Sequence, residues 1–302
     1  MSKEFNNGQL IAGMENSQNL EKEQFQRNAD FIYRQWKPAN IEGWNTRILD
    51  VGEGSPVVFV PICQGLEAFD SLLIQHFSKS HRVITYQRRE DENSILGRES
   101  RARDLHQVVH HLGIEKAHFV SHSSGSIATT TLALEHPSLF LSYVWMNLSP
   151  KPAMDLVWWK KWLANLVRYV PLSDHTVVDL VAGSCSGEKK SSLLHARCYE
   201  QFMAIKKTAE VTSVKRWFER NVWSSAKYEW NTRAALEKLT MPVLAMNSDN
   251  DLVNSLKAMA GLEKLLPNSH GYKIVKGGWH LFQYLCADQV QDYMEAFYAE
   301  LR

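Results

Sequence analysis

The stretch Val120-Ser121-His122-Ser123-Ser124-Gly125-Ser126 joins an apolar run to a segment with helical character. A serine between small residues at a strand-to-helix junction is typical of a nucleophile elbow, a turn so sharp that only small residues fit beside the central serine. Such a turn lifts the serine hydroxyl clear of the sheet, and the start of the helix offers N–H groups at its positive end. We therefore predict that Ser123 is a nucleophile and that the backbone N–H of Ser124 stabilises an oxyanion.

A serine-rich turn that only caps a helix has the same local pattern, so the rest of the chain decides between the two interpretations. Apolar runs alternate with amphipathic segments on both sides of the turn, which is typical of a mostly parallel sheet covered by helices on both faces. We expect strands at 47–51, 57–60, 82–86, 117–120, 143–146, 242–246 and 272–275, and helices at 19–36, 70–77, 100–112, 125–135, 254–266 and 282–301. The predicted fold class is α/β, with a doubly wound, mostly parallel sheet.

The alternation stops between residues 151 and 235, where the sequence is helical and rich in tryptophan. Apolar residues keep helical spacing from Leu156 to Val170, and further helices are expected at 188–207 and 212–223. An insert at this point covers the carboxyl ends of the strands, where ligands bind in open α/β sheets. The predicted organisation is an N-terminal extension with a helix (1–45), a sheet domain (46–150 and 236–302) and a helical cap (151–235).

A serine hydroxyl needs a base to take its proton, and the base needs an acid to orient it. Asp249 and Asp251 follow one predicted strand, and His280 follows the last predicted strand after a glycine turn. Side chains at the carboxyl ends of parallel strands share one edge of the sheet, so we expect them to meet Ser123 there. His280 is the candidate base, whereas His122, beside the nucleophile, is expected to point elsewhere.

With these residues in this order, the chain resembles the α/β-hydrolase superfamily, in particular the capped branch that includes many carboxylesterases, lipases and hydrolases of small esters or lactones. The resemblance covers roughly Trp44 to Pro150 and Ala235 to Arg302. It is carried by the phrases Pro56-Val-Val-Phe-Val60, Leu112-Gly-Ile-Glu-Lys-Ala-His-Phe-Val120, Pro242-Val-Leu and Gly278-Trp-His280. It implies the α/β-hydrolase fold and a Ser-Asp-His triad. Dehalogenases and epoxide hydrolases of this fold use an aspartate nucleophile, so a serine at position 123 implies an acyl-type intermediate.

The resemblance also bears on the acid of the triad. In the family the acid usually ends a Gly-x-x-Asp phrase, and Ser248-Asp249-Asn250-Asp251 matches that phrase with serine for glycine. This match favours Asp251 over Asp249. Some relatives carry the acid after the preceding strand, but Asn147-Leu-Ser-Pro150 has no carboxylate at that place.

Two departures from the family pattern lie next to the proposed site. The first glycine of the elbow is Ser121, and the usual His-Gly phrase is replaced by Pro61-Ile62-Cys63-Gln64-Gly65. By position, the backbone N–H of Cys63 supplies the second oxyanion donor, with that of Ile62 the next choice. Cys63 itself is disfavoured as a nucleophile because it has no elbow context. The altered loop leaves the speed of turnover open.

Large apolar side chains near the predicted site favour a small, apolar or aromatic substrate. The candidate substrate-binding residues are Ile62 in the oxyanion loop, Trp159 and Trp162 in the cap, and Trp279 beside the base. Two other interpretations remain open. The cap tryptophans can simply bury the cap against the core, and the apolar stripe can lie on a membrane surface as a lipase lid does.

Composition limits the class of protein further. Of 302 residues, 44% are hydrophobic and 22% are charged, which indicates a globular chain. A net charge of +1, from 34 basic and 33 acidic residues, provides no field for nucleic acid. The N-terminus does not read as a secretory signal and no apolar stretch has the length of a bilayer, so we expect a cytoplasmic protein. Neither a metal nor an organic cofactor is expected, since the cysteines are scattered at Cys63, Cys185, Cys198 and Cys286 and no phosphate loop is present.

The function predicted from the sequence is a serine hydrolase that cleaves an ester, lactone or related acyl bond of a small molecule. Three alternatives use the same triad: an acyltransferase, a carbon–carbon bond hydrolase and a cofactor-free perhydrolase. A ligand-binding protein of this fold with weak or no catalysis is a further alternative, because the His-Gly phrase is missing. The oligomeric state and the identity of the substrate stay open.

Overall fold

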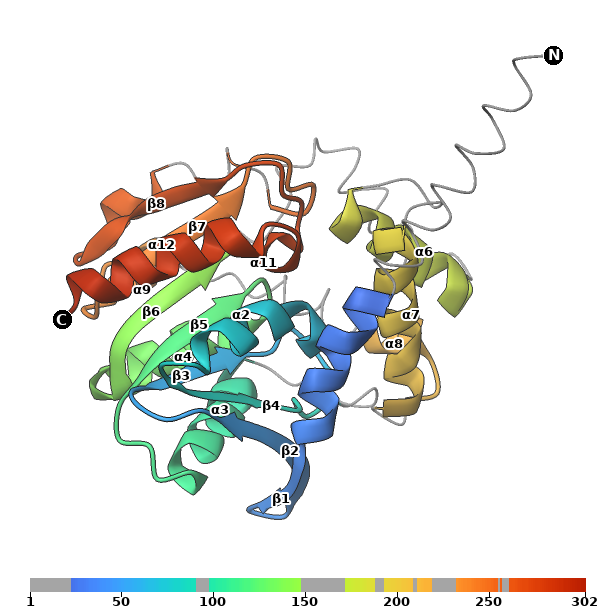
Figure 1. Ribbon diagram of the computed structural model, residues 1–302, viewed down its shortest axis with the longest axis horizontal. Helices are drawn as coiled ribbons and strands as arrows, with labels where there is room; N and C mark the ends of the chain where they lie inside the picture. The colour runs from blue at the N-terminus through green and yellow to red at the C-terminus, as the bar shows by residue number, and fades with distance from the viewer. Residues whose placement is uncertain are drawn as a thin grey trace.

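A mostly parallel sheet forms the centre of the molecule (Figure 1). The computed structural model describes residues 23–90, 98–147, 172–187, 193–208, 211–218, 232–254, 256 and 261–302. Within them the sheet has eight strands in the order β1-β2-β4-β3-β5-β6-β7-β8. The strands are β1 (Lys37–Ile41), β2 (Trp44–Val51), β3 (Pro56–Val60), β4 (Arg82–Tyr86), β5 (Ala117–His122), β6 (Phe140–Met146), β7 (Val243–Ser248) and β8 (Ser269–Val275). All seven predicted strands are therefore present, several of them longer than predicted.

The antiparallel edge of the sheet was not foreseen. Strands β3 to β8 pair in parallel, whereas β1 pairs with β2 and β2 with β4 in the antiparallel sense. Residues 37–45, predicted to belong to the N-terminal extension, form β1 and the beginning of β2. Strand β1 is largely exposed and has one neighbour. It therefore lacks the apolar run that marks a buried strand, and its Pro38 is tolerated at the edge.

Helices cover both faces of the sheet, as the alternation predicted. Along β3, Val57 and Phe59 pack into one hydrophobic cluster and Val58 and Val60 into the other, because successive side chains point to opposite faces. The first face is covered by a helix over residues 23–35 with α2 (Ser71–Phe77), α11 (Phe282–Leu285) and α12 (Ala287–Glu300). The second is covered by α3 (Arg98–His111), α4 (Gly125–Glu135) and α9 (Thr232–Leu236).

Several predicted helices are shorter or divided. The helix predicted at 282–301 is two helices, because the backbone of Cys286 (φ −124°, ψ 40°) leaves the helical region between α11 and α12. The helix predicted at 70–77 is preceded by a 3-10 helix, η1 (Glu67–Asp70). Two more 3-10 helices are η2 (Pro137–Leu139) and η5 (Leu262–Leu265). The last of these lies in the range predicted as a helix at 254–266, part of which is outside the described residues.

The described part of the predicted cap contains α6 (Asp174–Ser186), α7 (Leu193–Thr208) and α8 (Val214–Phe218), and α9 begins inside its predicted range, at Thr232. Helix α6 was not predicted. Its boundary signals are nevertheless in the sequence, since the Ser173 side chain accepts from the N–H of Thr176 and Gly187 ends the helix at φ 65°. A third hydrophobic cluster joins the cap helices to the loop after β3 through Ile62, Cys63 and Leu66. The helix predicted at 156–170 lies outside the described residues.

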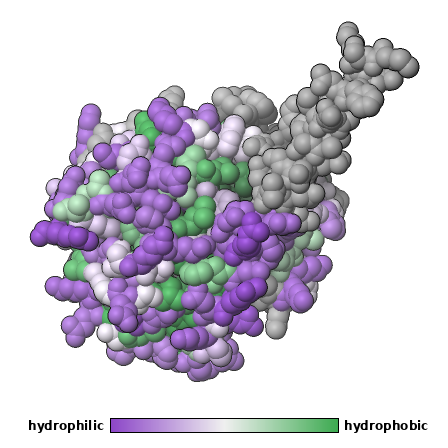
Figure 2. Space-filling view, viewed as in Figure 1, coloured by the Kyte–Doolittle hydropathy of each residue, from purple (hydrophilic) through white to green (hydrophobic). Residues whose placement is uncertain are grey.

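No helix in the described ranges is long and apolar enough to cross a bilayer. Figure 2 shows hydrophilic residues over most of one face of the molecule, with hydrophobic residues as smaller patches between them.

Candidate active site

The turn between β5 and α4 has the geometry of a nucleophile elbow. Ser123 has φ 49°, in the left-handed region that few non-glycine residues adopt, and its N–H donates to the carbonyl of Met146 (2.9 Å). A Cβ atom at Gly125 would lie only 2.6 Å from the carbonyl oxygen of Val60. Glycine at this position therefore lets helix α4 approach the end of β3 and places the serine at the tip of the turn.

Ser121 stands where the family has glycine, and it fits there because its hydroxyl is hydrogen-bonded. Its Oγ donates to the Oγ of Ser126 (2.9 Å) and lies 2.8 Å from the hydroxyl of Tyr143 on β6. All three groups are buried. A buried hydroxyl without partners would destabilise the turn, and this one has two.

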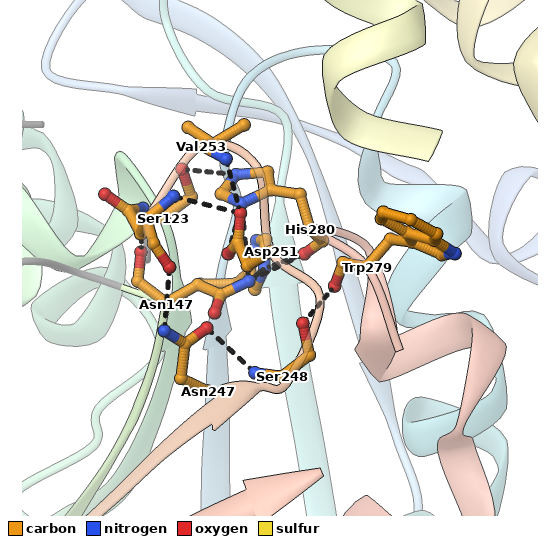
Figure 3. A network of polar contacts seen from close by, with 10 residues as sticks. Ser123, Asn147, Asn247, Ser248, Asp251, Val253, Trp279 and His280 are labelled. Carbon is orange, nitrogen blue, oxygen red and sulfur yellow. Dashed lines mark hydrogen bonds and ion pairs between the residues drawn. The ribbon is translucent and has the colours of Figure 1, made fainter. Parts of the chain in front are cut away.

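Ser123, His280 and Asp251 meet at the carboxyl ends of the strands (Figure 3). Nε2 of His280 lies 3.0 Å from Oγ of Ser123, and Nδ1 lies 2.9 Å from Oδ2 of Asp251. The other carboxylate oxygen of Asp251 accepts from the N–H groups of Val253 (2.6 Å) and Asn254 (2.9 Å). The three side chains thus form a continuous hydrogen-bonded path from carboxylate to hydroxyl.

Asp251 is held in its charged form. Burial by itself raises the pKa of this carboxyl, but the neighbouring His280 and the N–H donors of Asn254 and Val253 outweigh burial and lower the pKa below its usual value. A carboxylate accepts a hydrogen bond from Nδ1–H, which keeps the proton of the neutral imidazole on Nδ1 and leaves Nε2 free to accept the proton of the serine hydroxyl. The electrostatics therefore favour the tautomer that a general base needs.

Asp249, the second candidate acid, has a structural role. Its Oδ1 accepts from the N–H of Gly277 (3.0 Å) and so holds the turn that follows β8. The structure places Asp251 and not Asp249 against His280.

The main chain of His280 is also fixed, by two residues that the sequence did not single out for this purpose. Its carbonyl accepts from Nδ2 of Asn147 (2.8 Å) and lies 2.7 Å from Nε2 of His122. Burial, together with the nearby His280, lowers the pKa of His122 to about 3, so this imidazole is neutral and can donate from Nε2. His122 is buried and contacts the carbonyl of His280 and not the hydroxyl of Ser123.

Asn147 occupies the place where some relatives carry the triad acid, and its Nδ2 lies 3.3 Å from Nδ1 of His280. Its carbonyl accepts from Nδ2 of Asn254 (2.6 Å), whose own carbonyl accepts from Nδ2 of Asn247 (2.9 Å). These amides tie the ends of β6 and β7 to the loop of Asp251. The position of Asn147 after a strand was the signal that could have identified it.

In the loop after β3, most N–H groups are already engaged. Those of Gln64, Gly65 and Leu66 donate to Glu90 (3.2 Å), Glu67 (2.7 Å) and the carbonyl of Cys63 (3.3 Å). Within the described residues, the N–H groups of Ile62 and Cys63 in this loop and of Ser124 in the elbow donate to no other group. These are the two loop donors and the elbow donor that the sequence predicted for an oxyanion.

The thiol of Cys63 is protonated. Burial raises its pKa well above the usual value, and the nearby Arg88 opposes this only in part. Because a thiolate, not a thiol, is the reactive form, this shift of the pKa disfavours Cys63 as a nucleophile.

The candidate substrate-binding residues fall into three groups. Ile62 is buried beside the loop donors. Trp279 is half-buried and its ring packs flat on the end of α6, where a Cβ at Gly187 would lie 1.9 Å from ring atoms. Figure 3 shows this ring directed away from Ser123, so Trp279 joins the loop of His280 to the cap. Trp159 and Trp162 lie outside the described residues. No set of three or more His, Cys, Asp or Glu side chains in the described ranges is arranged to hold a metal ion.

The sheet order, the elbow and the strand-end residues together define an α/β hydrolase. Residues 56–285 match the family model described as the alpha/beta hydrolase fold, and the chain belongs to this family. No curated protein matched the chain in a sequence comparison.

Solved structures with the same fold include several hydrolases. A meta-cleavage product hydrolase from Pseudomonas fluorescens IP01 superimposes with a TM-score of 0.71 at 19% identity, covering 88% of this chain and 98% of that one. A carboxylesterase from Bacillus subtilis gives 0.66 at 17% identity, covering 91% and 96%. Est816, an N-acyl homoserine lactone degrading enzyme, gives 0.67 at 18% identity, covering 86% and 100%. At these identities the likeness establishes a shared fold, and the family supports a hydrolase.

Proposed function

We propose that this chain is a serine hydrolase that cleaves an ester, lactone or related acyl bond of a small, apolar or aromatic substrate. The observation that carries the proposal is the path from Asp251 through His280 to the hydroxyl of Ser123, with distances of 2.9 and 3.0 Å. A serine hydroxyl is a weak nucleophile until a base within hydrogen-bond reach removes its proton.

In the first half of the reaction, His280 Nε2 takes the proton of Ser123 while Oγ bonds to the carbonyl carbon of the substrate. The carbonyl oxygen becomes an oxyanion, which the N–H groups of Ser124 and Cys63 stabilise. As the oxyanion collapses, the bond to the leaving group breaks and His280 returns the proton to that group. Asp251 stabilises the charged imidazole during both proton transfers.

In the second half, a water molecule gives a proton to His280 and attacks the acyl carbon of the acyl-enzyme. The second oxyanion collapses, the bond to Ser123 Oγ breaks, and the proton returns to that oxygen. We propose that the cap covers this site and that Ile62, Trp159 and Trp162 contact the apolar part of the substrate.

Carbon–carbon bond hydrolysis is the second candidate, because the fold is shared with a meta-cleavage product hydrolase. Acyl transfer and perhydrolysis also run through the same hydroxyl, base and acid. Product analysis separates them, since hydrolysis releases a free acid in water whether or not another acceptor is added.

The test is a panel of nitrophenyl esters of graded acyl length, with lactone, thioester and vinylogous diketone substrates, assayed on the wild type, Ser123→Ala and Ser78→Ala. We expect Ser123→Ala to lose about 10⁴-fold or more in kcat, and Ser78→Ala, a matched change far from the site, to keep activity. A fluorophosphonate should label the wild type at Ser123 alone. Hydrolysis at the wild-type rate by folded Ser123→Ala, or failure of the probe to label the wild type, would reject the proposal.

A further inference from the structure

Two peptide planes determine where the N–H of Cys63 points. The plane between Ile62 and Cys63 is held at its carbonyl, which accepts from Oγ of Ser124 (2.9 Å). The plane between Cys63 and Gln64 is held at its N–H, which donates to Oε1 of Glu90 (3.2 Å). The N–H of Cys63 lies in the first of these planes, and peptide units are planar. The hydrogen bond to the Ile62 carbonyl therefore fixes its direction, and the bond to the Gln64 N–H holds the plane that follows. The loop has no regular secondary structure that would otherwise do so.

Glu90 is a buried carboxylate that joins three parts of the molecule. Its side chain is 0% exposed. Oε1 accepts from Nε of Arg88 (2.8 Å) as well as from the loop, and Oε2 accepts from Nε1 of Trp217 (3.0 Å). Arg88 follows β4 of the core, whereas Trp217 lies on cap helix α8, 127 residues beyond Glu90 in the chain. One carboxylate therefore touches the oxyanion loop, the core and the cap.

Gln64 makes a second contact with the segment that carries Glu90. Its side-chain Nε2 donates to the carbonyl of Arg88 (2.9 Å), so both its backbone and its side chain bind the segment that carries Glu90. Any displacement of residues 88–90 is therefore transmitted to Gln64 and to the plane beside Cys63.

Three groups of the described residues donate to Glu90, namely the N–H of Gln64, Nε of Arg88 and Nε1 of Trp217. A buried carboxylate is stable only when it is paired and its oxygens are hydrogen-bonded. Arg88 provides the charge: burial lowers the pKa of its guanidinium, but the attraction of Glu90 outweighs burial and the pKa is raised. Trp217 donates to Oε2, and its indole is fully buried in the cap. Loss of that donor favours a rotation of the carboxylate, which moves Oε1 away from Gln64.

We propose that Glu90 is a positioning residue that makes the oxyanion donor of Cys63 depend on the seating of cap helix α8 through Trp217. This inference rests on the proposed function. When the indole is in place, the loop presents the Cys63 N–H to the developing oxyanion. When the indole is displaced, the donor is misplaced while Ser123, His280 and Asp251 keep their geometry.

The test uses Trp217→Phe, which keeps an aromatic ring and removes the N–H donor. We expect kcat to fall about 10-fold with KM within about 2-fold, since an oxyanion donor acts on the transition state more than on the bound substrate. The inhibition constant of a trifluoromethyl ketone, whose tetrahedral adduct carries an oxyanion, should rise in proportion to the fall in kcat/KM. Phe202→Leu is the matched control, since it reduces packing in the cap against Phe218 without a polar contact to the loop; we expect its kcat to stay near that of the wild type.

Glu90→Gln provides a second variant, with a fall in kcat at least as large, because an amide cannot accept from both sides. If this variant does not fold, owing to the buried Arg88, Trp217→Phe decides alone. Wild-type kcat in folded Trp217→Phe, or a lower kcat with unchanged inhibitor affinity, would overturn the inference. A wild type that the fluorophosphonate labels shows that such a failure concerns Glu90, whereas an unlabelled wild type means that the proposed function itself has failed.

Discussion

The nucleophile side and the oxyanion side of the site are built in different ways. On the nucleophile side, Ser123 directly follows β5, Asp251 lies three residues after the end of β7, and His280 follows the last strand after a short turn. On the oxyanion side, the loop from residue 61 to 66 is irregular and is held by buried side chains from distant segments, chiefly Glu90. The difference teaches that Ser123, Asp251 and His280 are brought together mainly by the strand ends, whereas the proposed oxyanion donor depends on buried side chains of the core and, as we propose, on the cap.

The largest effect is expected on the nucleophile side, from Asp251→Asn. An amide would offer a donor to Nδ1 of His280 and stabilise the wrong tautomer, so kcat should fall on the order of 10⁴-fold in the ester assay. Asp249→Asn is the control, with kcat expected within about 3-fold of the wild type because Asp249 only holds the turn at Gly277. Equal losses in the two variants would contradict this assignment of the acid.

A second variant tests the same assignment by moving the carboxylate from position 251 to position 147. The double variant Asp251→Asn with Asn147→Asp places an acid at the end of β6, where the present amide lies 3.3 Å from Nδ1 of His280. We expect it to recover about 10-fold in kcat over Asp251→Asn. Absence of any recovery would mean that the direction of approach, and not only the charge, is essential.

The next prediction tests the contact between the elbow that carries Ser123 and the end of β3, where the oxyanion loop begins. In Gly125→Ala the new Cβ meets the Val60 carbonyl at 2.6 Å, where the oxyanion loop begins, and the free energy of unfolding should fall by about 3 kcal/mol. Gly183→Ala, whose nearest neighbour would be at 3.9 Å, is the control and should be neutral or stabilising. Chemical denaturation measures both; similar midpoints for the two variants would show that the close approach is not needed.

A smaller effect is expected from Ser124→Ala, which removes the hydroxyl that holds the carbonyl of Ile62. We expect kcat to fall about 10-fold with little change in KM, because the Cys63 N–H is less well directed. Combined with Trp217→Phe, the loss should be smaller than the product of the two single losses, since both bonds orient one group. Full multiplication of the losses would indicate that they act independently.

The smallest effect concerns a buried acid on the oxyanion side. Burial is the main cause that raises the pKa of Glu67 to about 8 from 4.5, although N–H groups of its own residue and of Gly65 oppose this. Between those two values the folded chain binds more protons than the unfolded chain, so the free energy of unfolding falls as pH rises. Glu67→Gln should reduce the loss of melting temperature between pH 5 and pH 9 by at least about 2 °C.

Part of that pH dependence should remain in Glu67→Gln, because burial also raises the pKa of Asp70, to about 7. The exposed Glu53→Gln provides the control and should melt like the wild type at every pH. A slope with pH that is unchanged in Glu67→Gln would contradict the assignment to this carboxyl.

The same contrast explains what could be predicted from the sequence. The elbow has a local signal, a serine and a glycine two residues apart after an apolar run, and His280 follows a glycine turn after the last strand. Parallel strands bring such residues to one edge regardless of the cap. The fold, the seven strands from β2 to β8 and the three residues that meet at the site could therefore be predicted from short segments.

The supporting contacts had no local signal. The tripeptide Arg88-Arg89-Glu90 has the composition of a solvated surface, yet the side chain of Glu90 is completely buried, because it binds partners 26 and 127 residues away. The hydrogen bonds of His122 and Asn147 to the carbonyl of His280 likewise join residues from three strand ends. Strand β1 was missed because an exposed edge strand needs no apolar alternation.

The contact between His122 and the His280 carbonyl has one more consequence. The side chain of His122, the residue immediately before Ser123, is hydrogen-bonded to the backbone carbonyl of His280. The hydroxyl of Ser123 and the imidazole of His280 are therefore attached to the same local framework. This contact limits how far the imidazole can move from the hydroxyl, because a displacement of one backbone must break a buried hydrogen bond to the other.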